Sequence, residues 1–335
     1  MVDELRVQNF RKHNDFKVRF KPGVNIIIGK NGSGKTSLIE AIYISYQGKS
    51  WKSNFIEILN KNSDWWRVDY KDRIIKYNDS QKTFIINNKE QSRLSEKDKN
   101  AIILFEPQDL NLLYRSPLSR RSWLDNFISG LEDNYRKTVN KYNRILKQRN
   151  ILLKNQAPKE QLFVWDIQFA TLASEIIKNR KKYIKLINER IEEEYKKISS
   201  KKVNIILEYE SKINTEQEIL NTINLNYQYE INCGHTSIGP HQHDIVFKVN
   251  HKDASKTLSR GENRSLILAL KNLEYELNKF KDPLILLDDI LSEFDDIHQI
   301  NLLNRYKNNQ IIITSVKTPK IDQKVNIIDL DKLLK

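Results

Sequence analysis

The stretch VNIIIGKNGSGKTSLIEAIY, Val24–Tyr43, decides the fold class of this chain. A run of β-branched residues leads into a glycine-rich turn, and the turn opens into residues with helical periodicity. The segment GKNGSGKT, Gly29–Thr36, matches the pattern G-x-x-x-x-G-K-[ST] completely. Strand, loop and helix in this order predict a phosphate-binding loop (P-loop) in an α/β protein.

The P-loop predicts a binding site for a nucleoside triphosphate. Backbone N–H groups from Asn31 to Thr36 can converge on a phosphate at the start of a helix, where the peptide dipoles favour negative charge. We expect Lys35 to reach the β- and γ-phosphate oxygens as a catalytic residue, and the Thr36 hydroxyl to hold Mg²⁺. The predicted nucleotide-binding residues are Gly29, Lys30, Asn31, Gly32, Ser33, Gly34, Lys35, Thr36 and Ser37.

An acidic partner for the metal follows a second apolar strand. In PLILLDDILSEFDD, Pro283–Asp296, a buried-type strand ends at Asp288 and Asp289. Carboxylate oxygens suit Mg²⁺, so Asp288 is the expected metal residue, acting through water. Asp289 points in another direction and is the expected general base for an attacking water.

The segment KTLSRGENRSLILAL, Lys256–Leu270, predicts a second helix start. Ser259 and Gly261 stand just ahead of a strong helical pattern, where N–H groups can take a γ-phosphate. The P-loop already uses one helix start, and both cannot serve one phosphate from the same side. We therefore expect this segment to meet a nucleotide bound to another copy of the chain.

The predicted secondary structure changes twice along the chain. The first hundred residues predict short strands with turns, residues 117–202 predict long helices that form a hairpin around Ala157-Pro158, and strands return from about Val203. The P-loop and Asp288 can share a nucleotide only if the two strand regions close one sheet. We predict a discontinuous lobe, 1–116 with 203–335, and a helical insertion, 117–202.

Charge is concentrated in this helical insertion. It carries 20 Lys and Arg against 10 Asp and Glu, which accounts for most of the net charge of +14. Two interpretations weigh about equally: an ordinary solvated helical pair, or a stripe that contacts nucleic-acid phosphates. The candidate DNA-binding residues are Arg120, Arg121, Arg144, Lys147 and Arg149.

Other features restrict the class of protein. No apolar run has the length of a membrane span, and the first residues lack a signal-peptide core, so we expect a cytoplasmic protein without a membrane partner. Cys233 is the single cysteine, which excludes an intramolecular disulfide. The His235, His241 and His243 group could suggest a metal, but its position at a Gly-Pro turn favours a structural role.

Taken together, the motifs resemble those of ABC-type ATPases. GKNGSGKT, LSRGE, LILLDD and LSEFD occur in the order of the Walker A, signature, Walker B and D-loop motifs, with a long separation typical of the SMC-like branch. Further segments resemble the RecF family of bacterial recombination mediators: QNFRKH, IEAIY, GKSWK, LFEPQDLNLLYRSPLSRRSWLD, YNRILKQRNILLK and SIGPHQHDIVF. These matches run from end to end of the chain.

The resemblance implies an ABC-type head of two sheet lobes with an α-helical inserted lobe. It also implies a head-to-tail homodimer driven by ATP, in which the signature residues Ser259, Arg260, Gly261 and Glu262 face the nucleotide of the other subunit. Arg11 is expected near the nucleotide, and Gln108 at the position that helps to hold Mg²⁺. The dimer would clamp double-stranded DNA at gaps or junctions near the nucleoid, with slow, DNA-dependent ATP hydrolysis and RecR and RecO as partners.

The sequence also departs from the family pattern. Glu262 stands where the family usually has Gln, Gln108 stands where it usually has Glu, and the region from Phe55 to Lys99 matches weakly. Two alternatives stay open: a transporter-associated ATPase, and an SMC-type structural clamp that barely hydrolyses ATP. The strand ending at Thr314-Ser315 lacks the switch histidine of transporter ATPases, which speaks against the first.

Overall fold

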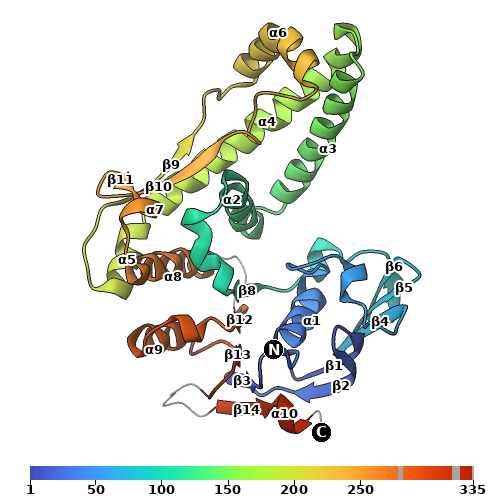
Figure 1. The fold of residues 1–335 in the computed structure, drawn as a ribbon, viewed down its shortest axis with the longest axis vertical. Coiled ribbons are helices and arrows are strands. Elements are labelled where there is room, and N and C mark those ends of the chain that lie inside the picture. Colours follow the sequence, from blue (N-terminus) through green and yellow to red (C-terminus); the bar gives the residue numbers. More distant parts are fainter. Residues whose placement is uncertain (278–281, 319–324, 334–335) are drawn as a thin grey trace. The chain divides into compact units, whose positions relative to one another are not determined.

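The computed structural model describes residues 1–277, 282–318 and 325–333. The chain divides into two compact units, Met1–Asp109 with Phe280–Lys335, and Leu110–Lys279 (Figure 1). The second unit is wider than the predicted insertion, 117–202, at both ends. At its N-terminal end the unit includes most of η3, Pro107–Tyr114, and at its C-terminal end three strands and the signature helix belong with the inserted helices.

A parallel sheet in the first unit carries the nucleotide motifs. Among the described residues its strand order is β14-β3-β13-β12-β8, and every neighbouring pair is parallel. The bounds are β3 Val24–Ile28, β8 Ile102–Phe105, β12 Leu284–Asp288, β13 Ile311–Ser315 and β14 Val325–Asp329. The middle strands are buried almost throughout, which explains their continuous apolar runs. The predicted closure of one sheet by distant segments is confirmed.

The first unit also contains an antiparallel sheet, of order β2-β1-β4-β5-β6-β7. Its strands are β1 Glu4–Phe10, β2 His13–Arg19, β4 Trp65–Tyr70, β5 Arg73–Asn78, β6 Gln81–Ile86 and β7 Lys89–Gln91. Trp66 is fully buried against Phe10 and Phe55, whereas Trp65 is 39% exposed. Alternating burial along these strands fixes one face against the core.

Short helices complete the first unit. They are α1 Lys35–Gln47, η1 Phe55–Ile58, η2 Glu96–Asp98, η4 Leu291–Glu293, α9 Asp296–Arg305 and α10 Leu330–Leu333, while η3 Pro107–Tyr114 leads into the second unit. The α1 helix begins at Lys35, within the last two residues of the P-loop motif, so strand, loop and helix follow one another as the sequence predicts.

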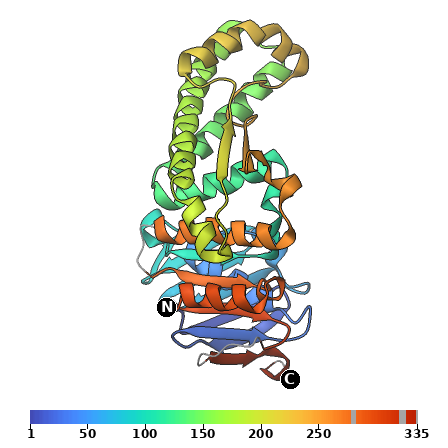
Figure 2. The ribbon, with the colours of Figure 1, turned by 90° about the vertical axis from the view of Figure 1, so that its left-hand side faces the viewer.

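The second unit is built on a long antiparallel helical pair, α3 Tyr135–Lys154 and α4 Lys159–Asn188, which lie side by side (Figure 1). The other helices are α2 Pro117–Leu131, α5 Ile191–Ser199, α6 Glu216–Cys233, α7 Ala254–Thr257 and α8 Arg260–Leu277. A sheet of order β11-β10-β9 packs beside α4 (Figure 2), with β9 Ile205–Glu210, β10 Asp244–Val249 and β11 Lys252–Asp253. Ala157-Pro158 forms the predicted hairpin turn between α3 and α4.

Candidate nucleotide-binding site and signature face

The P-loop connects β3 to α1, and two of its glycines adopt a backbone conformation with positive φ. Gly32 and Gly34 have φ of 78° and 99°, which side chains rarely allow. A Cβ on Gly34 would lie 2.4 Å from Nε2 of His13. No side chain caps the start of α1. Because the first backbone N–H groups of a helix have no partner within it, those of α1 are available to an anionic ligand.

Lys35 is buried beneath the P-loop. Its ammonium donates hydrogen bonds to the carbonyl oxygens of Gly29, at 2.8 Å, and Lys30, at 3.0 Å. Carbonyl oxygens satisfy the buried charge of the ammonium. Phosphate oxygens of a bound nucleotide can replace these carbonyl contacts, because they offer the same kind of acceptor with a stronger charge.

The start of α1 meets the ends of β12 and β13 through three oxygen atoms. The hydroxyl of Thr36 donates to Oδ1 of Asp288 at 2.9 Å, and the hydroxyl of Thr314 donates to the same oxygen at 2.8 Å. Burial, more than any other cause, raises the pKa of Asp288. A hydroxyl beside a buried carboxylate fits the oxygen ligands that Mg²⁺ prefers. The structure therefore brings Thr36 and Asp288 together, and their role as Mg²⁺ residues stays a prediction.

Asp289 follows in a strained backbone conformation. Its φ is 52°, and its N–H donates to the Thr314 hydroxyl at 2.9 Å. Non-glycine residues are uncommon in this left-handed region, and such strain gathers at functional sites. The side chain is half-buried and follows Asp288 at the end of β12, and its role as a general base stays a prediction.

Arg11 is held by protein groups in this structure. Its guanidinium makes a bidentate ion pair with the buried Glu40 of α1, at 3.0 and 2.9 Å, and donates to the Glu57 carbonyl at 2.8 Å. Its neighbours reach the P-loop directly: Lys12 Nζ donates to the Gly32 carbonyl at 2.8 Å, and His13 Nε2 lies 3.1 Å from the Gly34 carbonyl oxygen. Sequence reasoning missed both contacts.

Two further positions border this site. Gln108 is exposed in η3, just after β8, the neighbour of β12 in the sheet. Asp331 of α10 accepts a hydrogen bond from the Lys30 backbone N–H at 3.2 Å, which brings the C-terminal part of the chain to the P-loop. Sequence analysis had no signal for the Asp331 contact, because Asp331 belongs to no recognisable motif.

The signature segment forms an exposed face at the start of α8. Ser259, Arg260 and Gly261 are exposed, and a Cβ on Gly261 would meet no atom within 4 Å. The carboxylate of Glu262 accepts from the Ser259 hydroxyl at 2.8 Å and from its backbone N–H at 3.1 Å. These two hydrogen bonds are the main cause that lowers the pKa of Glu262 to about 2, and the nearby Lys201 contributes in the same direction. The signature helix therefore starts with a capping box whose acid is ionised.

The five candidate DNA-binding residues separate into two kinds. Arg144 and Lys147 are exposed on α3, a helix that contains no acidic residue. Arg120 instead pairs with Asp244 at 2.5 Å, and Arg121 donates to the His243 carbonyl at 2.6 Å.

The prediction for Arg149 is wrong. The residue is fully buried, with Nε 2.6 Å from Asp166 and Nη2 2.7 Å from Glu230. A guanidinium in an interior needs such carboxylate partners, so Arg149 is part of the packing of α3, α4 and α6.

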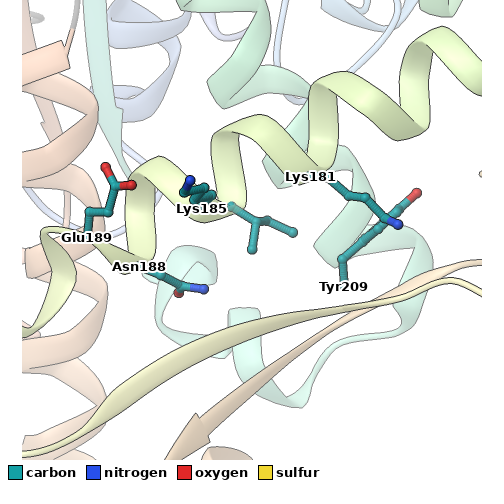
Figure 3. Close-up of a pocket in the computed structure, with 6 residues that line it drawn as sticks. Lys181, Lys185, Asn188, Glu189 and Tyr209 are labelled. Atoms are coloured by element: carbon teal, nitrogen blue, oxygen red, sulfur yellow. The ribbon is translucent and has the colours of Figure 1, made fainter. Parts of the chain in front are cut away.

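Two lysines that the sequence analysis did not select line a pocket of about 480 Å³ in the second unit. Figure 3 shows Lys181 and Lys185 of α4 around this pocket with Tyr209 of β9. Lys181 Nζ donates to the Asn214 side chain at 2.5 Å. Both lysines are exposed, which makes them better placed than Arg149 to meet a polyanion.

The histidines of the Gly-Pro turn contact tyrosines. His241 Nδ1 lies 2.5 Å from the Tyr142 hydroxyl, and His243 Nδ1 lies 2.8 Å from the Tyr209 hydroxyl. Burial lowers the pKa of each imidazole to about 4. Within the part of the chain that the structure describes, no group of three or more His, Cys, Asp or Glu could hold a metal ion. No helix in that part is long and apolar enough to cross a membrane.

Comparisons with known proteins agree with these motifs. The family model described as the RecF/RecN/SMC N terminal domain matches residues 1–332. The chain is 33% identical over 332 residues to the DNA replication and repair protein RecF of Clostridium perfringens, covering 93% of this chain and 92% of that protein. RecF of Alkaliphilus oremlandii is 31% identical over 339 residues, covering 94% and 93%.

Solved structures give the same match in three dimensions. A structure of the recombination mediator protein RecF with ATPrS, in the RecFOR pathway, aligns with a TM-score of 0.86 and 26% identity over 98% of this chain and 97% of that one. An Smc head bound to the C-winged helix domain of ScpA aligns with a TM-score of 0.53 and 16% identity, over 94% of this chain and 89% of that one. The second likeness concerns the fold alone. The predicted fold class, an ABC-type head with an inserted helical lobe, is confirmed.

Proposed function

This chain belongs to the RecF family of DNA replication and repair proteins, and we propose that it works as an ATP-driven clamp on duplex DNA. The observation that carries the proposal is the hydrogen bond between Thr36 and Asp288. It joins the P-loop to the end of β12, as a site for a nucleoside triphosphate and its metal requires.

ATP would bind with its phosphates at the start of α1. Lys35 would exchange the carbonyl oxygens of Gly29 and Lys30 for phosphate oxygens, and Arg11 would stay beside the site through Glu40. Thr36 and Asp288, with Gln108 from the adjoining segment, would hold Mg²⁺, which supplies charge neutralisation at the phosphates when bound. Asp289 would orient the attacking water and accept its proton.

The signature face would complete the site from a second copy of the chain. Ser259, Arg260 and Gly261 are exposed and leave open space above the helix start, which is the geometry needed to approach a γ-phosphate. ATP would thereby join two chains head to tail, and hydrolysis would separate them. A protein whose hydrolysis only resets such a clamp needs a slow turnover, and we expect DNA to stimulate it.

Duplex DNA is the proposed ligand of the clamp. The acid-free helix α3 presents Arg144 and Lys147, and α4 presents Lys181 and Lys185, so phosphates can be met without reading base edges. Binding would be largely independent of sequence, at gaps or junctions near the nucleoid in the cytoplasm. RecR and RecO are the proposed protein partners, by analogy with the RecF structure of the RecFOR pathway.

The test is DNA binding by the wild type and by Lys35→Met, with and without ATP, across a salt series. We expect ATP to strengthen binding to a gapped duplex, Lys35→Met to remove that gain, and affinity to fall steeply with salt. Lys89→Met, at an exposed lysine of β7, is the matched control and should behave as the wild type. DNA binding that is unchanged by ATP, by salt and by Lys35→Met would reject the clamp and favour a different ATPase role.

A further inference from the structure

The signature face contains a charge that its expected ligand should repel. Glu262 lies in the first turn of α8, and its Oε2 accepts both the hydroxyl and the backbone N–H of Ser259. A γ-phosphate that approaches Ser259 from another subunit would meet this carboxylate at close range. Like charges at an interface oppose association, and the cost rises as water is excluded.

A lysine from a separate element offsets this charge. Lys201 lies in the segment between α5 and β9, and its Nζ is 3.0 Å from Oε1 of Glu262. Ser259 occupies one carboxylate oxygen and Lys201 the other. The three side chains therefore form a continuous row in which Glu262 joins the signature serine to a cation.

We propose that Lys201 is a positioning residue for the signature face: it neutralises Glu262 and keeps that carboxylate oriented on Ser259, so that an anionic phosphate from a second copy can approach. The inference rests on the proposed ATP-driven dimer and deepens it. It follows from the particular residue at position 262, because a neutral Gln there would cap Ser259 without bringing a charge.

Because Lys201 and Glu262 are exposed, we expect their interaction to affect dimerisation more than the stability of the single chain. In this structure the Lys201 side chain is 62% exposed and that of Glu262 is 32% exposed. Water screens such a pair, so it adds little to the stability of the isolated chain. When a second subunit covers the face, water screens these charges less. The repulsion between Glu262 and an approaching phosphate, and its neutralisation by Lys201, then become stronger.

The experiment measures the dimer dissociation constant in Mg²⁺ and ATP by sedimentation. The proteins are the wild type, Lys201→Ala, Lys201→Arg, Glu262→Gln and the double variant Lys201→Ala/Glu262→Gln. We expect Lys201→Ala to weaken dimerisation about three- to tenfold at low salt, and less at high salt. Lys201→Arg keeps the charge and should stay near the wild type. The double variant should dimerise as Glu262→Gln does, because the uncompensated carboxylate is gone.

Controls separate this role from general damage. Lys202→Ala removes the adjacent exposed lysine and should leave dimerisation unchanged. Melting temperature should be nearly the same in every variant, because the Lys201–Glu262 pair is exposed and adds little stability. Binding of a fluorescent ATP analogue by the monomer should also be unchanged, because both residues belong to a different unit from the P-loop.

Each other outcome overturns the inference. If Lys201→Ala dimerises as the wild type does, the lysine has no role. If the double variant stays as weak as Lys201→Ala, the lysine contacts the other subunit directly and Glu262 is irrelevant. If the wild type itself fails to dimerise with ATP, the proposed function fails and the inference with it, which is distinguishable because the first two results require a wild-type dimer.

Discussion

The P-loop and the signature face differ in how deeply their side chains are buried. Lys35 is buried and bonded to two carbonyls, and Thr36 is bonded to Asp288. Ser259, Arg260 and Gly261 are instead exposed above a capped helix start. The first region lies at the ends of strands of a parallel sheet, whereas the second lies at an exposed helix start and, in the proposed function, would need a second copy of the chain to become a site.

The largest expected effect comes from a pair of matched glycine substitutions. Gly34→Ala places a Cβ 2.4 Å from His13 at a φ of 99°, so we expect a loss of about 2 kcal/mol or more in the free energy of unfolding and loss of nucleotide binding. Gly261→Ala faces open space in a helix, and should change stability by less than about 0.5 kcal/mol.

Chemical denaturation and binding of a fluorescent ATP analogue measure both changes. Gly261→Ala should bind nucleotide as a monomer and lose affinity only for the second copy. Equal damage from the two substitutions would remove the distinction between the P-loop and the exposed signature face.

A second pair applies the same contrast to one helix. Arg149→Ala leaves Asp166 and Glu230 without their buried cation and should cost about 3–5 kcal/mol of stability. Arg144→Ala, on the exposed side of α3, should leave stability unchanged and lower the slope of log affinity for DNA against log salt by about 1. Thermal melts and a DNA titration at several salt concentrations test both, and a stable Arg149→Ala protein would contradict the packing role.

A smaller effect should appear with pH. Burial lowers the pKa of His241 to about 4, below the value of about 6.5 in an unfolded chain. The unfolded state therefore binds the proton first, and the free energy of unfolding of the second unit should fall as the pH drops from about 6.5 to about 4. His241→Asn should reduce this dependence, while His235→Asn, at an exposed histidine, should not. Urea melts at several pH values provide the measurement.

Local patterns predicted the parts of the fold that depend on neighbouring residues. The P-loop, the strand before Asp288 and the helix start after Ser259 lie where their motifs indicate. The sequence predicts long helices over residues 117–202, but within this range α2 ends at Leu131 and α3 begins at Tyr135, a break that helical periodicity does not reveal.

Other features needed the tertiary structure. Sequence analysis missed α6 because the helix is mostly polar and buries few apolar side chains, although its capping box of Thr215 and Glu218 was a usable signal. The burial of Arg149 depends on Glu230, far along the chain, and periodicity cannot reveal such a partner. Lys12 and Asp331 likewise reach the P-loop only through the folding of distant strands.

The central claim is that ATP bound at the P-loop joins two chains through the signature face. Sedimentation velocity of the wild type and of Ser259→Arg, with and without ATP and Mg²⁺, tests it most directly. We predict that ATP converts the wild type from monomer to dimer, while Ser259→Arg binds ATP and remains a monomer. An oligomeric state that is indifferent both to ATP and to Ser259→Arg would contradict the account.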